Sequence, residues 1–162
     1  MVKNAVRRGK LPWTPRAQAV LEQAEQQARK DGFDLVGTEH LVFGIVSDEE
    51  CLGATILRNL GLTETEYIRH YEPLRPASPG ERAGQARFSE DIDKVIQCAY
   101  QQATQWGHTY IGAEHLLAGT LLARAGQGFQ ILTTLGITLD KVRDETAKLI
   151  VCQNTQTERK EK

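Results

Sequence analysis

The sequence has little net charge, few cysteines and no long apolar run, and each of these features argues against a class of protein. Twenty lysines and arginines stand against 21 aspartates and glutamates, a formal net charge of −1, whereas binding to nucleic acid normally needs a clustered basic face. No apolar run approaches the roughly 20 residues of a membrane-spanning helix, and no apolar segment follows the basic first ten residues, as a secretory signal would require. We therefore expect neither a nucleic-acid-binding protein nor a membrane protein.

The common sequence motifs of zinc sites and of hydrolase active sites are missing as well. Cys51, Cys98 and Cys152 are far apart, and no Cys-x-x-Cys spacing occurs, so a structural zinc site is not expected. We interpret the three cysteines as reduced thiols of a cytosolic protein, because disulfides are rare in that compartment. Neither Gly-x-Ser-x-Gly nor His-Glu-x-x-His is present, and both are marks of common hydrolases. The prediction is a protein that is not an enzyme and that uses no metal and no cofactor.

The sequence does contain an internal repeat. Residues 13–63 align with residues 88–138 without a gap, and 17 of the 51 aligned pairs are identical. The tetrapeptide Gly-x-Glu-His occurs at residues 37–40 and again at residues 112–115. Because chance does not maintain one register over such a length, we interpret the chain as a tandem duplication.

Each repeat has the pattern of four helices. Apolar residues recur at helical spacing in the first predicted helix of both repeats. Thr14 and Ser89 precede these helices as N-caps, and Gly32 and Gly107 fall just past their ends. The later helices are predicted to begin near residues 38 and 113, and to span 52–60 and 127–135, then 64–71 and 139–150. No segment alternates for long enough to form a strand, so the predicted fold class is all-α, with two tandem four-helix repeats.

These patterns divide the chain into a series of segments. We predict a basic arm, a first repeat, a linker, a second repeat and a flexible tail, at residues 1–12, 13–71, 72–87, 88–150 and 151–162. The linker holds three prolines and two glycines and has no apolar periodicity, so we expect it to be mobile. The arm is interpreted as solvated because the chain as a whole is close to neutral.

Two long stretches resemble a known family. They read TPRAQAVLEQAEQQARKDGFDLVGTEHLVFGIV and DKVIQCAYQQATQWGHTYIGAEHLLAGTLL, and they are followed by ATILRNLGLTETEY and FQILTTLGITLDKVR. Together they resemble the Clp N-terminal repeat, the double-repeat domain at the front of Clp-type AAA+ unfoldases, and most of all the ClpC and ClpA kind. The resemblance covers about residues 13–150. It implies a pseudo-twofold pair of four-helix repeats, and a location in the cytoplasm or, in a eukaryote, in the plastid stroma.

The ATPase modules of the full-length unfoldases have no counterpart here. No Gly-x-x-x-x-Gly-Lys-[Ser/Thr] occurs. The resemblance implies a stand-alone Clp N-terminal protein, which we favour from the basic arm and hydrophilic tail, or the N-terminal fragment of a ClpC-type ATPase. In both cases it implies a non-enzymatic interaction module whose partners are Clp unfoldase or protease subunits, adaptor proteins or client proteins. An alternative function is a stand-alone sink for cyclic peptide ligands that protects the unfoldase.

Glu39 and Glu114 are the predicted ligand-binding residues. A carboxylate in the first turn of a helix also has a structural role, because the helix dipole favours it there. The neighbouring His40 and His115 are expected to hydrogen-bond within the core, since a Glu-His pair without a third ligand is a weak metal signal. The resemblance to ClpC-like proteins implies that the matching glutamates contact phosphoarginine on client proteins. Such contacts are chemically reasonable because a carboxylate accepts paired N–H···O bonds from a guanidinium group.

Thr38 is predicted to act as an N-cap and, through the resemblance, as the hydroxyl on the phosphate side of the ligand. The N–H groups at the helix start are expected to bind the phosphate. Ala113 stands at the equivalent position of the second repeat, so the second site is expected to be weaker or lost. Two functional binding sites on one domain would add avidity for clients that carry several phosphoarginines.

Trp13 and Phe88 are matched aromatic residues just before the first helix of each repeat. One interpretation is a hydrophobic staple, in which each ring packs on its own helix. The other, implied by the resemblance, is an apolar groove that receives adaptor proteins or cyclic peptides. Trp106 and Tyr110, which flank the second glycine turn, are predicted to be packing residues.

Overall fold

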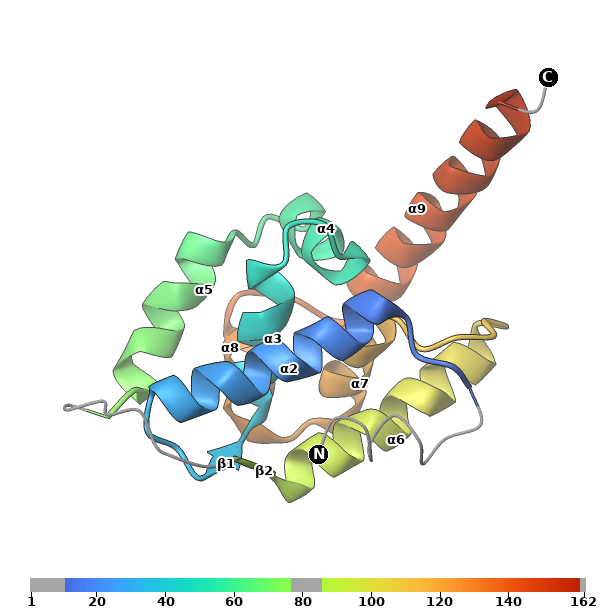
Figure 1. The fold of residues 1–162 in the computed structure, drawn as a ribbon. Helices are drawn as coiled ribbons and strands as arrows, with labels where there is room; N and C mark the ends of the chain where they lie inside the picture. The colour runs from blue at the N-terminus through green and yellow to red at the C-terminus, as the bar shows by residue number, and fades with distance from the viewer. Residues whose placement is uncertain (1–10, 77–85, 161–162) are drawn as a thin grey trace.

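The computed structural model describes residues 11–76 and 86–160, with side chains described as far as residue 150 (Figure 1). The elements are α2 (Pro15–Lys30), β1 (Leu35–Val36), α3 (Thr38–Ser47), α4 (Leu52–Asn59), α5 (Glu64–Tyr71), the 3₁₀ helix η1 (Glu72–Leu74), β2 (Arg87–Phe88), α6 (Glu90–Gln105), α7 (Ala113–Ala123), α8 (Gly126–Thr134) and α9 (Leu139–Lys160). The predicted all-α fold is confirmed, with α2 to α5 in the first repeat and α6 to α9 in the second. Residues 1–10 of the predicted arm and 77–85 of the predicted linker lie outside the described residues.

The first helix of each repeat begins and ends where its capping residues predict. The hydroxyl groups of Thr14 and Ser89 accept the backbone N–H three residues later, at 3.1 and 3.4 Å. Gly32 and Gly107 follow the helix ends with φ of 80° and 72°. Glycine is favoured at both positions because a side chain would be strained in this left-handed conformation.

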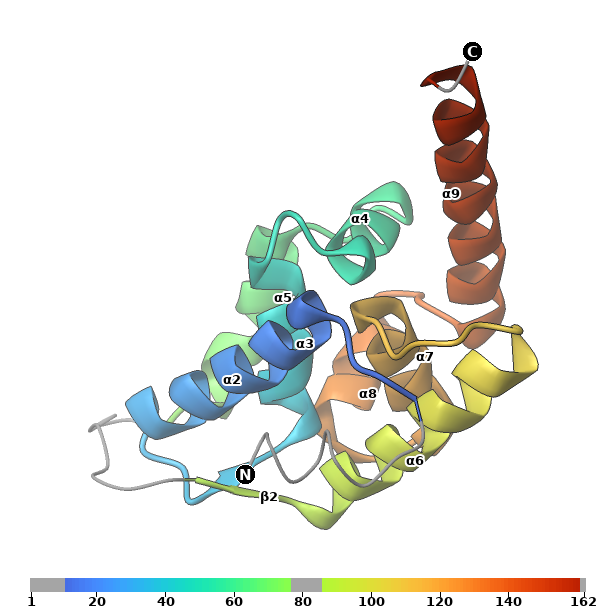
Figure 2. The same ribbon diagram turned by 45° about the vertical axis from the view of Figure 1, so that its right-hand side comes forward.

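The last helix is longer than predicted. We expected α9 to end at residue 150, but it continues to Lys160. Residues 151–160 contain neither glycine nor proline, so nothing in the local sequence stops the helix. In both views α9 points away from the rest of the molecule (Figures 1 and 2). No helix in residues 11–76 or 86–160 is long and apolar enough to cross a membrane.

Short parallel backbone pairs, which the sequence does not predict, join the two repeats. Val36 of β1 lies opposite Phe88 of β2, and an isolated bridge joins Trp13 to Ile111. Trp13 and Phe88 are repeat equivalents, as are Val36 and Ile111, so the two pairs are related by the pseudo-twofold symmetry. In each pair, the segment before one repeat's first helix meets the loop before the other repeat's second helix. Segments of two residues are too short to show the alternation that marks a strand.

Two repeated glycines allow helices of opposite repeats to touch. Gly128 of α8 lies against the backbone of Thr38 at the start of α3, where an added Cβ would overlap the Thr38 carbonyl group. Its repeat equivalent, Gly53 of α4, lies against the start of α7, where a Cβ would be 3.3 Å from the Ala113 oxygen. Each second helix therefore begins underneath the third helix of the other repeat.

A continuous apolar core extends through both repeats. It includes side chains from Trp13 in the first repeat to Val142 in the second. Within each repeat the first and second helices cross closely, because a Cβ on Gly44 or Gly119 would lie 2.7 or 2.5 Å from a backbone oxygen of the neighbouring helix. Since the repeats share one core, the chain forms one domain and neither repeat can bury its apolar surface alone.

A buried carboxylate ties the end of α2 to the end of α5. Asp31 is 0% exposed and accepts hydrogen bonds from Gln27 Nε2 at 3.0 Å, from Arg75 Nε at 2.9 Å and from the Tyr71 hydroxyl. A buried carboxylate costs free energy unless it is paired and hydrogen-bonded, and these three donors meet that requirement. Trp106 stands at the equivalent position of the second repeat, so this network belongs to the first repeat only.

We predict that Gly128→Ala lowers the free energy of unfolding by about 1–3 kcal/mol, because the added methyl group overpacks the contact with Thr38. At an open helix position the same change would stabilise the helix by up to about 1 kcal/mol, so the sign of the effect distinguishes the two situations. The measurement is unfolding in urea. Thr133→Ala, at an exposed position of the same helix, is the control. Unchanged or higher stability of Gly128→Ala would show that the repeats do not depend on this close contact.

Candidate binding site at the starts of α3 and α7

Both Gly-x-Glu-His tetrapeptides form the first turn of a second helix. Gly37 and Gly112 are the N-cap residues, and their backbone N–H groups donate to Nδ1 of His40 at 3.0 Å and of His115 at 2.9 Å. The N-cap predicted at Thr38 is therefore wrong, because glycine is the N-cap in both repeats. The histidine supplies the reciprocal bond that Glu or Gln gives in a capping box. The predicted hydrogen bonding of both histidines within the core is confirmed.

The two glutamates fold back over these glycines. A Cβ on Gly37 or Gly112 would lie 2.7 Å from the carboxylate carbon of Glu39 or Glu114. Each carboxylate also accepts a hydrogen bond from the backbone N–H of its own residue. The glycine is repeated together with the glutamate because a larger N-cap residue would displace the carboxylate from the helix start.

Neither carboxylate is paired with a lysine or arginine within residues 11–76 and 86–150. Each lies instead near the neighbouring imidazole, Glu39 Oε1 3.8 Å from His40 Nδ1 and Glu114 Oε1 3.7 Å from His115 Nδ1. These imidazoles are neutral, because Nδ1 accepts a backbone N–H and because burial lowers the pKa of His40 to about 4 and of His115 to about 3. Burial also raises the pKa of both glutamates. An external cation would therefore stabilise either carboxylate.

The two glutamates differ in accessibility. The Glu39 side chain is 15% exposed and the Glu114 side chain 4%. Tyr110 lies close to Glu114 in the second repeat, and burial together with that negative neighbour raises the pKa of Tyr110 to about 12. The repeat equivalent of Tyr110 is Leu35, which is 47% exposed and has no hydrogen-bonding side chain. Glu39 of the first repeat is thus partly accessible, whereas its equivalent in the second repeat, Glu114, is covered.

A hollow of about 550 Å³ lies beside the first helix start. It is lined by residues of β1, β2 and the beginning of α6, namely Leu35, Arg87, Phe88, Ser89, Glu90 and Asp91. The negative charge of Asp91, which lines the hollow, contributes to the raised pKa of Glu39. This surface combines the exposed Leu35 and the half-buried Phe88 with two carboxylates and one arginine.

The matched aromatic residues lie in different surroundings. Trp13 is 6% exposed, and its Nε1 donates to the Tyr100 hydroxyl at 2.7 Å. Tyr100 belongs to α6, so Trp13 packs on the other repeat, across the pseudo-twofold axis. A hydrophobic staple, which was one of the two predictions, would instead have placed the ring on its own helix, α2. Phe88 is half-buried and lines the hollow. Of the two residues predicted to form an apolar groove, Phe88 is at the accessible surface and Trp13 is not.

Thr38 is fully buried between the repeats. Its hydroxyl donates to the Ala125 carbonyl oxygen at 3.3 Å and accepts from the Gly128 N–H at 3.0 Å. Both partners belong to the second repeat, so the hydroxyl completes the contact with α8. A phosphate group could reach Thr38 only if this contact opened, and the predicted phosphate role has no accessible hydroxyl in this arrangement.

The fold and its duplicated helix starts match a known family. The family model of the Clp repeat (R) N-terminal domain matches residues 12–129 and 87–162. The chain belongs to this family. Clp N-terminal repeat domains are non-catalytic interaction domains.

The Clp repeat domain described here is similar to parts of much longer proteins. It is 32% identical over 144 residues to the negative regulator of genetic competence ClpC/MecB of Bacillus subtilis, covering 88% of this chain and 18% of that protein. It is 30% identical over 148 residues to the chaperone protein ClpB of Oceanobacillus iheyensis, covering 91% of this chain and 18% of that protein. The chain therefore spans 18% of the length of these curated relatives.

Solved structures share the fold at low sequence identity. The N-terminal domain of ClpD from Arabidopsis thaliana has a TM-score of 0.67 and 18% identity, covering 85% of this chain and 94% of that chain. A complex of the ClpV N-domain with a VipB peptide has a TM-score of 0.70 and 12% identity, covering 91% of this chain and 89% of that chain. These likenesses support the all-α fold of the Clp repeat domain.

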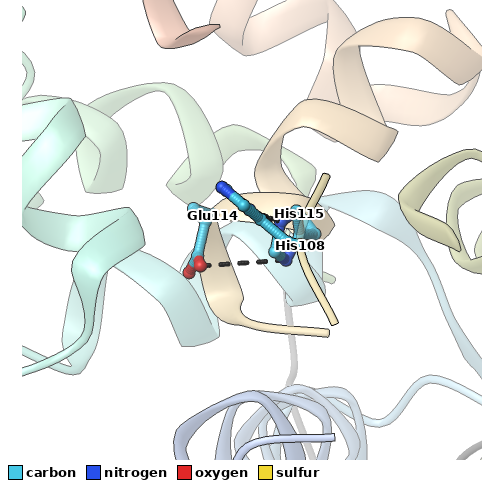
Figure 3. A group of neighbouring side chains, drawn as sticks. All are labelled: His108, Glu114 and His115. Carbon is cyan, nitrogen blue, oxygen red and sulfur yellow. Dashed lines mark hydrogen bonds and ion pairs between the residues drawn. The ribbon is translucent and has the colours of Figure 1, made fainter. Parts of the chain in front are cut away.

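A third side chain joins the second helix start. His108 Nδ1 lies 2.7 Å from His115 Nε2, and ligand atoms of His108, Glu114 and His115 all lie within 4.8 Å of one another (Figure 3). Because His115 Nδ1 accepts the Gly112 N–H, His115 Nε2 carries the proton and donates to His108. Both nitrogens of His115 are thus occupied, on opposite sides of the ring. The arrangement fits a hydrogen-bonded helix start rather than a shared metal ion.

No sequence pattern predicted a role for His108, and Tyr110 was predicted to be a packing residue only. The rings of these two residues stack with centroids 5.4 Å apart. Their repeat equivalents are the apolar Phe33 and Leu35, so a comparison of the repeats does not mark them. The available signal was a hydroxyl-bearing side chain four residues before Glu114, close enough in the chain to reach it.

We predict that the domain loses stability as the pH falls from 7 to 5. The folded-state pKa of His40 and His115 is depressed below the ordinary value of about 6.5. The unfolded chain therefore binds more protons below about pH 6.5, and the stability that depends on the neutral imidazoles is lost as the pH falls towards the folded-state pKa. For each histidine the expected loss over this range is about 2 kcal/mol. The raised pKa of the two glutamates acts in the opposite direction, most strongly at the acid end.

His40→Gln is the matched variant for this measurement. Glutamine keeps an acceptor for the Gly37 N–H at the capping-box position but does not titrate. Urea unfolding at a series of pH values should show about half the wild-type loss in His40→Gln. Equal losses in the two proteins would exclude His40 as a source of the pH dependence.

Proposed function

We propose that this Clp repeat domain is a docking module that binds protein partners of a Clp unfoldase–protease machine at the start of α3. The observation that carries the proposal is Glu39, a partly exposed carboxylate without an internal counter-ion in the described part of the chain. Leu35, two residues before the N-cap of the same helix, lines a hollow together with Phe88 and Asp91, and the negative charge of Asp91 acts on Glu39. The domain acts by equilibrium binding, without making or breaking a covalent bond.

A guanidinium group has the chemistry that this surface fits best. It donates two parallel N–H···O bonds to one carboxylate, and the second negative charge on Asp91 adds to the attraction. An apolar residue of the same partner segment can be buried against Leu35 and Phe88. We therefore propose client or adaptor segments that carry an arginine-type group beside an apolar residue.

Phosphoarginine is our candidate for the recognised group on client proteins. The start of α3 is a poor site for its phosphoryl group, because the Glu39 N–H is taken by its own carboxylate and the Thr38 hydroxyl is buried. Arg87, an exposed cation that lines the hollow, is the residue to which we assign the phosphoryl group. One surface thus has partners for both opposite charges of phosphoarginine.

The chain spans only 18% of the length of its curated relatives, so the partners of the whole Clp machine are also a matter of proposal. We propose Clp unfoldase or protease subunits, adaptor proteins or client proteins as the partners. The peptide held by the ClpV N-domain supports peptide binding on this fold. Capture of apolar cyclic peptides is a second candidate function, favoured by the size of the hollow and by the exposed Leu35.

We predict that a peptide with phosphoarginine next to an apolar residue binds the domain, and that Glu39→Gln weakens this binding about 10- to 100-fold through loss of charge-assisted hydrogen bonds. The measurement is titration calorimetry. Glu64→Gln, which changes an exposed glutamate in the first turn of α5, is the matched control and should bind as the wild type does. The same peptide with unmodified arginine separates the contribution of the guanidinium group from that of the phosphoryl group.

Two results would contradict the proposal. One is that neither peptide binds the wild-type domain. The other is that Glu39→Gln binds as tightly as Glu64→Gln does.

A further inference from the structure

The second helix start has the same elements as the first but is closed. Only 4% of the Glu114 side chain is exposed, compared with 15% for Glu39. The Tyr110 ring lies parallel to the His108 ring, with an interplanar angle of 4°, and its centroid lies 5.3 Å from that of the His115 ring, which places Tyr110 close to Glu114. His108 is itself held by the hydrogen bond from His115. A continuous series of contacts therefore positions the tyrosine over the carboxylate.

The first repeat lacks each part of this closure. Leu35 and Phe33 stand in place of Tyr110 and His108, and neither side chain has a hydrogen-bonding group. Leu35 lines the hollow and is 47% exposed. The charge at one further position differs between the repeats, because the repeat equivalent of the negative Asp91 is the positive Arg16. The second repeat therefore has no counterpart of the carboxylate that lies near Glu39.

We propose that the domain binds one guanidinium-bearing group per chain, at Glu39, and that Tyr110 is the residue that closes the equivalent site at Glu114. This inference rests on the function proposed above. The tyrosine acts as an internal ligand, because its hydroxyl is a donor that takes the place of a guanidinium group beside Glu114. The avidity expected from two sites on one domain then does not arise, and a client with several marks must bind several copies of the domain.

A reciprocal exchange between the repeats tests this proposal. Tyr110→Leu gives the second repeat the residue of the first, and Leu35→Tyr does the converse at an exposed position. Calorimetry with the phosphoarginine peptide should give one site per chain for the wild type and a second, weaker site for Tyr110→Leu, because the second repeat has no counterpart of Asp91. Leu35→Tyr should weaken binding at least about 10-fold, because a tyrosine hydroxyl then competes for Glu39. Tyr110→Phe keeps the ring that stacks on His108 and removes only the hydroxyl, so it tests the closure even where Tyr110→Leu does not fold.

A second readout needs no ligand. A carbodiimide activates accessible carboxyl groups, and glycine ethyl ester then displaces it to leave an amide that mass spectrometry locates. Wild-type protein should be labelled faster at Glu39 than at Glu114, and the Tyr110 variants should gain label at Glu114. Two binding sites in the wild type, or equal labelling of both glutamates, would overturn the inference. If no variant binds the peptide, the proposed function fails, while the labelling still decides whether Tyr110 closes Glu114.

Discussion

The close contact of Gly128 with the backbone of Thr38, and of Gly53 with Ala113, holds the two repeats together. Helix and helix start approach this closely only where no side chain separates them. The contact places both Gly-x-Glu-His turns at the boundary between the repeats. The candidate site is therefore a product of the way the duplicated halves pack.

A helix start in such a place must satisfy its own polar groups. The first N–H groups of a helix have no partner inside the helix, and water has little access at the boundary between the repeats. The histidine three residues after the glycine accepts one of these N–H groups, and the glutamate accepts another. Both acceptors become partly or fully desolvated as a result. Folding has thus already met part of the desolvation cost of the Glu39 carboxylate, which favours its pairing with an incoming cation.

The same backbone turn produces two different surfaces. In the second repeat, Tyr110 and His108 pack with His115 around Glu114. In the first, apolar residues stand at those positions, and the pairing of β1 with β2 brings Phe88 and the start of α6 beside the helix start. Duplication supplied two equal carboxylates, and the residues around them made one of the two accessible.

Most of the fold was predictable from the sequence, because its signals are local. Helical periodicity, the N-caps Thr14 and Ser89 and the glycines after the first helices all act within a few residues of one another. The errors have non-local or competing causes. Thr38 is a good N-cap residue in isolation, but the histidine at residue 40 caps Gly37, and the Thr38 hydroxyl contacts α8. The backbone pairs between the repeats are too short to leave a pattern in the sequence.

The sequence by itself determined the duplication, the order of the helices and the family, because each follows from residues compared position by position along the chain. It also identified Glu39 and Glu114 as the pair of interest. Only the tertiary structure decided which of them an outside group can reach and that Thr38 is out of reach. The physical reason is that exposure depends on neighbours brought together by folding, such as Gly128 over Thr38, and their proximity leaves no mark in the local sequence.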